Sequence, residues 1–512
     1  MIETDPQRGG VRGPAESRAF GRDLGRLAER VLPVLALVVA IAFVLVAAAH
    51  ATDRAFIQQQ AGSRMGLAQY AREGVLYPPL LQDGHYGGTR MMPIPVILHA
   101  GIGSLTDEFL VSGKLLTYVS FLVLLFVTFV TMRSLGCSSG RSAALAAAVA
   151  ATRVGLATSL TISYDALPVA LQLGAVLLVA RRRDRVAIAT AGVVCAAALL
   201  SKLSALWAVG AVVVWLWRRD RSALGVYLGA SVAAVGLGVS FVQLASGGRF
   251  AENVLMFSSS ALGNDGILRV PVQLLIVATV APAVIVLFAS AVTETVLAKS
   301  ARDLTIYHVS FWFAGAILLV VLTRSGAIGN HFLDLLVLCA VLTARLWVRW
   351  ERNPSRSGIV PIAVVLSLIV SSPALGLRGA DVVFGSDRLR ADIRFLDEWV
   401  DPHASLLAED PSIPVMRGQV PVVLDAFTLS TIGARHPDLI APLVQRLERH
   451  EFDLVILTHP LDAAPKDWFA DVPTGWYTVQ LGAEVASAIG RDYVLLAGRE
   501  RYYIYVPRDG SS

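Results

Sequence analysis

Residues 31–49 read VLPVLALVVAIAFVLVAAA, a stretch without a single charged side chain. A helix needs about 20 apolar residues to cross a bilayer. Lipid offers no partner for backbone N–H and C=O groups, so such a stretch is predicted to be helical. Comparable stretches recur up to residue 376. The sequence predicts eleven spans, near 32–50, 110–131, 142–160, 165–180, 186–201, 203–217, 223–245, 270–292, 306–323, 331–348 and 358–376. The predicted fold class is a polytopic α-helical membrane protein.

The composition of the 512 residues supports this class, with 55% hydrophobic and only 16% charged residues. Soluble domains contain roughly a quarter charged residues. The net charge of +5 could indicate a nucleic-acid partner, but the basic residues lie in short loops between apolar segments. We therefore expect membrane lipids, and no nucleic acid, as partners.

The orientation follows from the excess of Lys and Arg in cytoplasmic loops. The arginine-rich N-terminal tail and most short basic loops fall on one side. The short loops of the other side hold Lys202, Arg249, Arg269 and Arg324. The N-terminus is predicted to be cytoplasmic, without a cleavable signal peptide, and an odd span count places the C-terminus outside a plasma membrane. The predicted divisions are a tail (1–31), a transmembrane domain (32–376) with a long outer loop (51–109), and an extracytoplasmic α/β domain (377–512).

The outer loop contains two segments with helical character. SRMGLAQYAREG (63–74) has a helical pattern, and MMPIPVILHAGIG (91–103) is apolar but too short to span. Segments of that length are often interfacial. We expect two short helices on the membrane surface.

The C-terminal part alternates short apolar runs with amphipathic segments, which favours a small and mostly parallel sheet. The predicted strands are ASLLAE (404–409), PVVLDA (421–426), DLVILT (453–458), YVLLAG (493–498) and an edge strand RYYIYVPR (501–508). The predicted helices are 386–400 and 436–450.

Charged residues at membrane depth are costly and mark candidate functional sites. Asp165 starts the fourth span and is either a helix cap or a general base. Lys202 and Arg324 lie on the outer side, against the charge bias. An anionic ligand such as a lipid phosphate explains both, and snorkelling to headgroups is the alternative.

Two further segments carry polar groups near the same side. In DGHYGGTRMMPIP (83–95), glycines allow close backbone approach and Arg90 suits a phosphate; the alternative is an ordinary surface turn. At the start of the tenth span, His331 and Asp334 share a helix face. His331 has no second histidine at ligand spacing, so no dedicated protein metal site is predicted. A divalent metal, Mg²⁺ or Mn²⁺, held by carboxylates and phosphate remains open.

Several of these segments together resemble the GT-C superfamily of integral membrane glycosyltransferases, in particular its bacterial dolichyl-phosphate-mannose-protein mannosyltransferase and aminoarabinose transferase-like group. The matching segments are AQYAREGVLYPPL (68–80), GGTRMMPIPVILHAG (87–101), LLSKLSALW (199–207), GNHFLDLLVL (329–338), AEDPSIPVMRGQVPVVLDAFTLS (408–430) and EFDLVIL (451–457). Each match is weak alone, and their shared order is the stronger evidence.

The resemblance implies transfer of a hexose or pentose from a polyprenyl-phosphate donor to an envelope glycan, lipid or protein acceptor. An inverting transfer needs a base and cations beside the departing phosphate. The candidate catalytic residues are Asp53, Asp165 and Asp83. The candidate donor-phosphate ligands are Arg90, Lys202 and Arg324. The candidate substrate-binding residues are Glu73, His85, Tyr86, Asn330, His331 and Asp334.

One departure from the family pattern leaves two other functions open. Family members usually carry an acid about fourteen residues before the loop glycine, and counting back from Gly74 leads to Gln60. Asp53 lies nearer the membrane and could substitute. The alternatives are a transporter or flippase of a lipid-linked sugar, and a non-catalytic envelope-assembly protein that binds through its outer domain.

Overall fold

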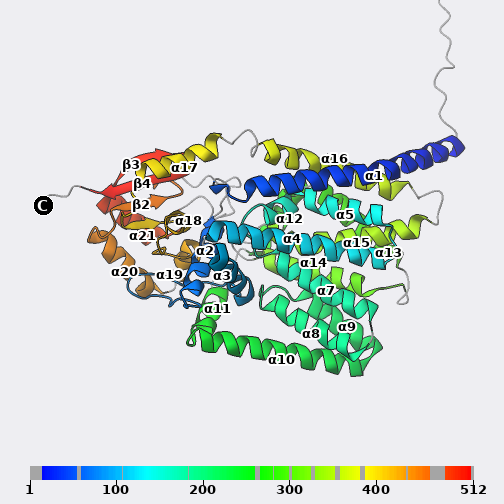
Figure 1. Ribbon diagram of the computed structural model, residues 1–512, viewed down its shortest axis with the longest axis horizontal. Coiled ribbons are helices and arrows are strands. Elements are labelled where there is room, and N and C mark those ends of the chain that lie inside the picture. The colour runs from blue at the N-terminus through cyan, green and yellow to red at the C-terminus, as the bar shows by residue number, and fades with distance from the viewer. Residues whose placement is uncertain are drawn as a thin grey trace, which may run out of the picture.

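A computed structural model describes most of the chain. The described residues are 14–54, 59–106, 108–182, 184–259, 266–280, 282–298, 303–323, 329–351, 358–380, 387–433, 436–461 and 479–508. Two parts lie end to end along the long axis, a helical bundle and an α/β part (Figure 1).

The bundle and its first outer loop consist of helices. They are α1 (Pro14–His50), α2 (Gln59–Arg72), α3 (Pro93–Thr106), α4 (Phe109–Ser134), α5 (Ser139–Ala151), α6 (Arg153–Ser159), α7 (Ala166–Arg181), α8 (Arg185–Leu199), α9 (Trp207–Arg219), α10 (Arg221–Ala245), α11 (Arg249–Ser259), α12 (Gly266–Val280), α13 (Pro282–Leu297), α14 (Ile306–Leu322), the 3₁₀ helix η2 (Gly329–His331), α15 (Phe332–Glu351) and α16 (Ile359–Ala380).

Four of the described helices are long and apolar enough to cross a membrane. They are Leu27–His50, Phe109–Ser134, Arg221–Ala245 and Gly329–Glu351. The bent pair α5 and α6 would be a fifth, and further apolar helices are shorter. A helix covers each predicted span, but the count of eleven membrane crossings stays a prediction.

Two predicted spans are not single straight helices. The span 142–160 bends by 73° between α5 and α6. Thr152 is extended there, and its side chain accepts from the backbone N–H of Gly155 at 3.0 Å, which starts a new helix. The span 270–292 is divided between α12 and α13. Pro282 opens α13, a position where its missing N–H costs nothing.

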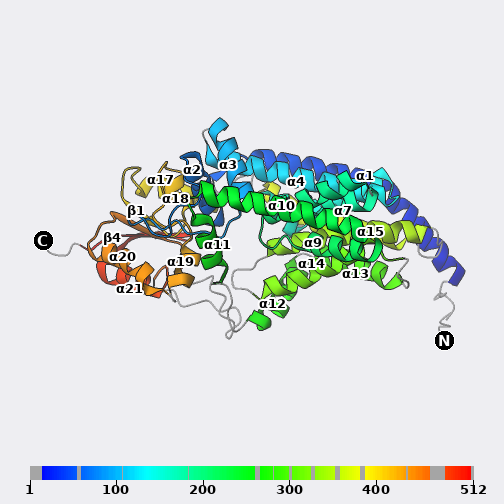
Figure 2. The same ribbon diagram turned by 90° about the horizontal axis from the view of Figure 1, so that it is seen from below.

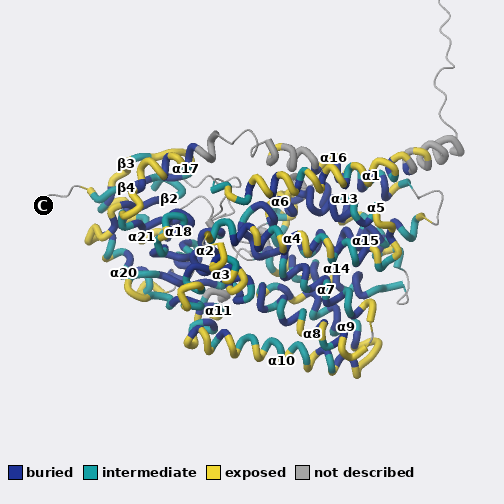
Figure 3. The backbone as a smooth tube through the Cα atoms, in the orientation of Figure 1, coloured by how far each residue is buried: buried dark blue, intermediate teal, exposed yellow. Residues whose placement is uncertain are grey.

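Helix α15 is the central helix of the bundle. Figure 3 shows it largely buried, whereas α1 and α10 keep exposed outer faces. In an apolar 18-residue stretch of each helix, the buried share of residues is 78% in α15, 33% in α1 and 11% in α10. The exposed side chains of α10 include Leu237 and Phe241, as suits a helix that faces lipid. The site described below forms where α15 begins.

The two ends of the bundle differ. Figure 2 shows that α1 begins at the end remote from the α/β part. The predicted orientation requires this separation, with the N-terminus and the α/β part on opposite sides of a membrane. Which side is cytoplasmic stays a prediction.

The α/β part contains α17 (Asp387–Trp399), β1 (Leu406–Ala408), α18 (Ser412–Val415), α19 (Ala426–Gly433), α20 (Pro437–Glu448), β2 (Leu454–Leu457), α21 (Ala483–Asp492), β3 (Tyr493–Arg499) and β4 (Tyr502–Pro507). Its four strands form one sheet in the order β1-β2-β4-β3. The helices expected near 386–400 and 436–450 are confirmed by α17 and α20.

Three expectations for the sheet are wrong. The sheet is mixed, because only β1 and β2 are parallel, while β2 with β4 and β4 with β3 are antiparallel. The last strand is not an edge: β4 lies between β2 and β3. Residues 421–426 form no strand of this sheet; Val423 makes only an isolated bridge to Tyr86, and α19 begins at Ala426.

The first outer loop packs tightly against the α/β part. A Cβ on Gly62 of α2 would lie 2.1 Å from the backbone nitrogen of Ser412, so only glycine fits there. The backbone N–H of Tyr86 donates to the carbonyl of Val422 at 2.7 Å, and Leu424 donates back to Tyr86 at 2.9 Å. The two predicted loop helices are confirmed as α2 and α3, and α2 is packed between the bundle and the α/β part.

Candidate functional site

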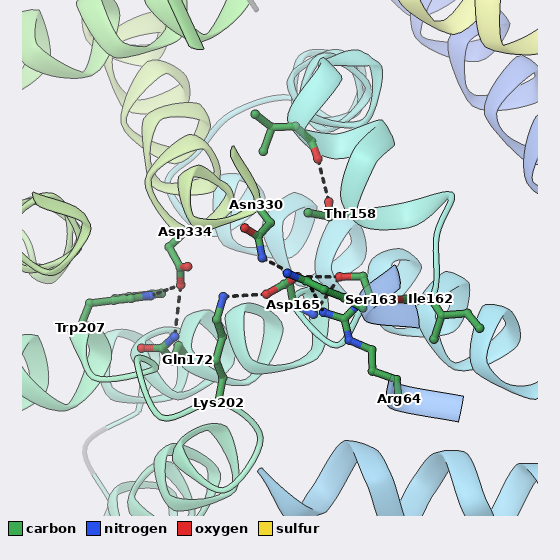
Figure 4. Close-up of polar contacts among 12 residues, drawn as sticks. Arg64, Thr158, Ile162, Ser163, Asp165, Gln172, Lys202, Trp207, Asn330 and Asp334 are labelled. Atoms are coloured by element: carbon green, nitrogen blue, oxygen red, sulfur yellow. Dashed lines mark hydrogen bonds and ion pairs between the residues drawn. The ribbon is translucent and has the colours of Figure 1, made fainter. Parts of the chain in front are cut away.

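Asp165 is the centre of a buried polar cluster at the end of the bundle nearest the α/β part (Figure 4). Its Oδ1 accepts a hydrogen bond from Lys202 Nζ at 2.6 Å. Its Oδ2 accepts from Ser163 Oγ at 2.6 Å and from Asn330 Nδ2 at 2.9 Å. Asp165 precedes α7, but its side chain makes no capping hydrogen bond. The carboxylate therefore serves the cluster rather than the helix end.

Both oxygens of Asp165 have protein partners. Lys202 Nζ forms an ion pair with Oδ1 at 2.6 Å, and Ser163 and Asn330 donate to Oδ2. A carboxylate whose oxygens are already occupied is badly placed to take a proton from a substrate. The geometry therefore favours a structural and electrostatic role for Asp165 over proton abstraction.

Arg64 is a site residue that the sequence did not single out. It lies on α2 with 9% of its surface exposed. Its Nη1 donates to the carbonyl of Ile162, its Nη2 lies 3.4 Å from Gln60 Oε1, and its guanidinium carbon is 5.5 Å from the centre of the Tyr164 ring. Burial lowers the pKa of this guanidinium, and the charge of Asp165 opposes the shift. Gln60, where the family acid was expected, is thus a neutral partner of a buried cation.

Arg90 brings a second cation from the loop that follows. It is half-buried, and its positive charge acts on both Arg64 and His331. Within the described residues, the Arg90 side chain forms no hydrogen bond or ion pair. Its guanidinium is therefore available to an anion. Arg324, the third predicted phosphate ligand, lies outside the described residues.

Asp334 has protein partners in this structure, whereas the sequence suggested a substrate contact. Its Oδ1 accepts from Trp207 Nε1 at 2.6 Å and from Gln172 Nε2 at 3.3 Å. Gln172 Oε1 in turn accepts from the backbone N–H of Ala208 at 3.3 Å. These contacts tie α7, α9 and α15 together beside Asp165 (Figure 4). Because α9 begins at Trp207, they also fix the end of the loop that carries Lys202.

We predict that Trp207→Phe lowers both stability and any activity that depends on Lys202. Phenylalanine keeps most of the packing but removes the N–H that satisfies Asp334, which costs about 1–3 kcal/mol when the acceptor is buried. Trp217→Phe is the matched control, because Trp217 lies on the same helix with 59% of its surface exposed. Equal melting temperatures for the two variants would show that the Asp334 contacts carry no stability.

The segment that carries Asp53 and the segment that carries Asp165 both form hydrogen bonds to helix α4. Lys114 of α4 donates through Nζ to the backbone carbonyls of His50 and Asp53 at the end of α1. One turn further along α4, Thr117 Oγ1 donates to the carbonyl of Ser163 and accepts from its N–H, at 2.9 and 3.0 Å. Residues three apart on a helix are neighbours. The segment with Asp53 and the segment with Asp165 are therefore anchored side by side on α4.

The structure places four other predicted site residues away from these contacts. Asp83 is exposed in a turn with a φ of 51°, and Glu73 is exposed after the end of α2. His85 Nδ1 lies 3.4 Å from the carbonyl of Pro421, and Tyr86 is buried in the core of the α/β part. The sequence suggested that the glycines of this segment let a ligand approach the backbone. Packing alone explains Gly87, because a Cβ there would lie 2.5 Å from the Pro78 side chain.

The described residues contain no group of three or more His, Cys, Asp or Glu placed to hold a metal ion. Both oxygens of Asp165 already accept hydrogen bonds from protein side chains. The donor set of the cluster therefore does not fit Mg²⁺ or Mn²⁺, and the chemistry proposed below uses no step through a metal.

The sequence matches no known family model and no curated protein. The fold, however, matches solved structures. ArnT from Cupriavidus metallidurans bound to undecaprenyl phosphate aligns with a TM-score of 0.60 at 11% identity, over 93% of this chain and 98% of ArnT. Its apo state aligns with a TM-score of 0.54 at 11% identity, over 92% and 97% of the two chains. The fold of this chain is therefore similar to that of ArnT over nearly the whole length of both chains.

The structure of a second protein also matches this fold. The Archaeoglobus fulgidus oligosaccharyltransferase, in complex with Zn and sulfate, aligns with a TM-score of 0.53 at 11% identity, over 82% of this chain and 67% of the archaeal one. At this identity the likeness concerns the fold alone. The resemblance noted in the sequence is thereby confirmed at the level of the fold, and the apolar helices agree with a membrane location.

Proposed function

We propose that this chain is an integral membrane glycosyltransferase that transfers a sugar from a polyprenyl-phosphate donor to a cell-envelope glycan, lipid or protein acceptor. The proposal places the reaction at the outer face of the plasma membrane. The observation that carries it is the charged cluster of Asp165, Lys202, Arg64 and Arg90, built into the GT-C fold where the bundle meets the first outer loop.

The cluster offers positive charge to a phosphate. Lys202 is held by a single carboxylate oxygen, and Arg90 forms no bond within the described residues. Lys202 and Arg64 face the carboxylate of Asp165, and Arg90 lies close enough for its charge to act on Arg64. The excess of positive charge supports binding of an anion, and the similar ArnT structure holds undecaprenyl phosphate. Asp165 then acts as a positioning residue that orients Lys202.

The chemistry is an attack of an acceptor hydroxyl on the anomeric carbon of the sugar. The new bond joins this carbon to the acceptor oxygen, and the bond to the phosphate oxygen breaks, which releases polyprenyl phosphate. Lys202 and Arg90 offset the charge that develops on the phosphate. The acceptor proton passes to a carboxylate, and we assign this role to Asp53, because the cluster occupies both oxygens of Asp165.

The experiment is a donor turnover assay with the purified full-length protein in nanodiscs. Undecaprenyl-phosphate-linked hexoses and pentoses are incubated with envelope material, and released undecaprenyl phosphate is measured by mass spectrometry. We expect turnover of at least one donor, and its loss in Asp53→Asn. Donors that are moved across vesicles but never cleaved would indicate a transporter. Neither cleavage nor movement would favour an assembly protein and overturn the proposal.

A further inference from the structure

The side-chain amide of Asn330 is held in one orientation. Asn330 lies in η2, immediately before α15, and faces Asp165 Oδ2 at 2.9 Å. A carboxylate that is ionised can only accept hydrogen bonds, and Asp165 forms an ion pair with Lys202 at 2.6 Å. The amide nitrogen must therefore point at Asp165, and the amide oxygen Oδ1 must point the other way.

Among the residues that the structure describes, the oxygen of this amide has no hydrogen-bond partner. Asn330 Oδ1 is shielded from solvent, and within the described residues nothing donates a hydrogen bond to it. An unsatisfied buried acceptor costs about 1–3 kcal/mol. Such groups are rare in native proteins and call for an explanation by a water, an ion or a ligand. The residue as a whole is only half-buried, so a ligand can reach it.

The chemistry of the missing partner is restricted. An amide oxygen accepts hydrogen bonds, so the partner must be a donor. The phosphate of a polyprenyl-phosphate sugar is a diester without a proton at neutral pH, and it belongs beside the cations instead. The hydroxyl groups of the attached sugar are donors. Lys202 and Asn330 bind the two oxygens of one carboxylate, so a phosphate near Lys202 brings its sugar near Asn330.

We propose that Asn330 Oδ1 accepts a hydrogen bond from one hydroxyl of the donor sugar and thereby selects the sugar. This inference rests on the proposed function. A site that leaves a buried acceptor unpaired penalises an analogue that lacks the matching hydroxyl. Undecaprenyl phosphate without a sugar has no sugar hydroxyl and so leaves this oxygen without its hydrogen bond. Asn330 therefore contributes to recognition of the sugar and not to recognition of the lipid phosphate.

The test compares donors with and without each hydroxyl. The probes are the undecaprenyl-phosphate sugar that the wild-type protein turns over, its monodeoxy analogues, and undecaprenyl phosphate itself. We expect the wild-type protein to discriminate at least tenfold in kcat/KM against one monodeoxy donor. In Asn330→Ala this discrimination should disappear, while binding of undecaprenyl phosphate changes less than twofold. Discrimination that persists unchanged in Asn330→Ala overturns the inference.

Two further variants separate recognition from structure. Asn330→Ser keeps a hydroxyl that can donate to Asp165 but is shorter, and it serves if the alanine variant does not fold. Gln172→Ala is the matched control, since Gln172 also donates to a carboxylate but has its oxygen satisfied by Ala208. We expect it to keep the wild-type discrimination. If the wild-type protein neither cleaves a donor nor binds undecaprenyl phosphate, the proposed function is refuted. If it cleaves a donor but Asn330→Ala discriminates as the wild type does, only the inference about Asn330 is refuted.

Discussion

Lys202→Met should abolish sugar transfer and destabilise the protein by about 3 kcal/mol, the typical cost of leaving one partner of a buried ion pair alone. Lys202 Nζ is 2.6 Å from Asp165 Oδ1, with 17% and 9% of the two side chains exposed. Solvent therefore screens this pair only slightly. The loss of one cation beside the departing phosphate should lower the transfer rate at least about a hundredfold.

A second substitution separates these two effects. In Lys202→Met with Asp165→Asn, both charges of this ion pair are removed, and Ser163 and Asn330 still have an acceptor. We expect this double variant to recover most of the lost stability, measured by thermal unfolding in detergent, but none of the transfer activity. Arg218→Gln, an exposed position at the far end of α9, is the control and should keep both. A double variant that regains transfer would assign Lys202 a purely structural role.

Gly62→Ala should lower stability by about 1–3 kcal/mol, the usual cost of overpacking, and weaken donor use. The added Cβ would stand 2.1 Å from Ser412 N and 2.8 Å from the carbonyl carbon of Pro411. Both are backbone atoms, so α2 must move away from the α/β part. Arg64 lies two residues further along α2 and would move with it. We therefore expect a higher KM for the donor as well as a lower melting temperature.

The matched control for this prediction is Gly101→Ala in α3. A Cβ on Gly101 meets nothing within 4 Å, and the substitution brings the same favourable change in helix propensity. Gly101→Ala should retain the wild-type melting temperature and KM. If Gly62→Ala destabilises the protein but leaves the KM for the donor unchanged, the α/β part does not position Arg64, and an acceptor-binding role for that part becomes the better explanation.

The sequence predicted the helices well because long uncharged stretches have few alternatives. It misjudged PVVLDA (421–426) because a short apolar run indicates burial but not what covers it. Those residues pack against α2 and the backbone of Tyr86 instead of joining the sheet. The sequence also could not predict that β4 lies inside the sheet, since strand order depends on contacts between distant segments.

The site was predicted in part. Lys202 and Asp165 stood out because charges are rare beside apolar segments, and the structure joins them directly. Arg64 was missed because its segment carries other charges, Arg72 and Glu73 among them, and only packing shows which one is buried. The predicted role of Asp165 as a base could not be judged without its neighbours, because Lys202, Ser163 and Asn330 together occupy both of its oxygens.

The central claim is that a lipid phosphate binds beside Lys202 and Arg90, and equilibrium binding of undecaprenyl phosphate to Arg90→Gln tests it most directly. Within the described residues Arg90 has no hydrogen bond or ion pair to lose, so this substitution should leave the melting temperature unchanged. We predict at least tenfold weaker binding than to the wild-type protein, and equal binding to Arg218→Gln. Wild-type affinity in the well-folded Arg90→Gln variant would contradict the claim.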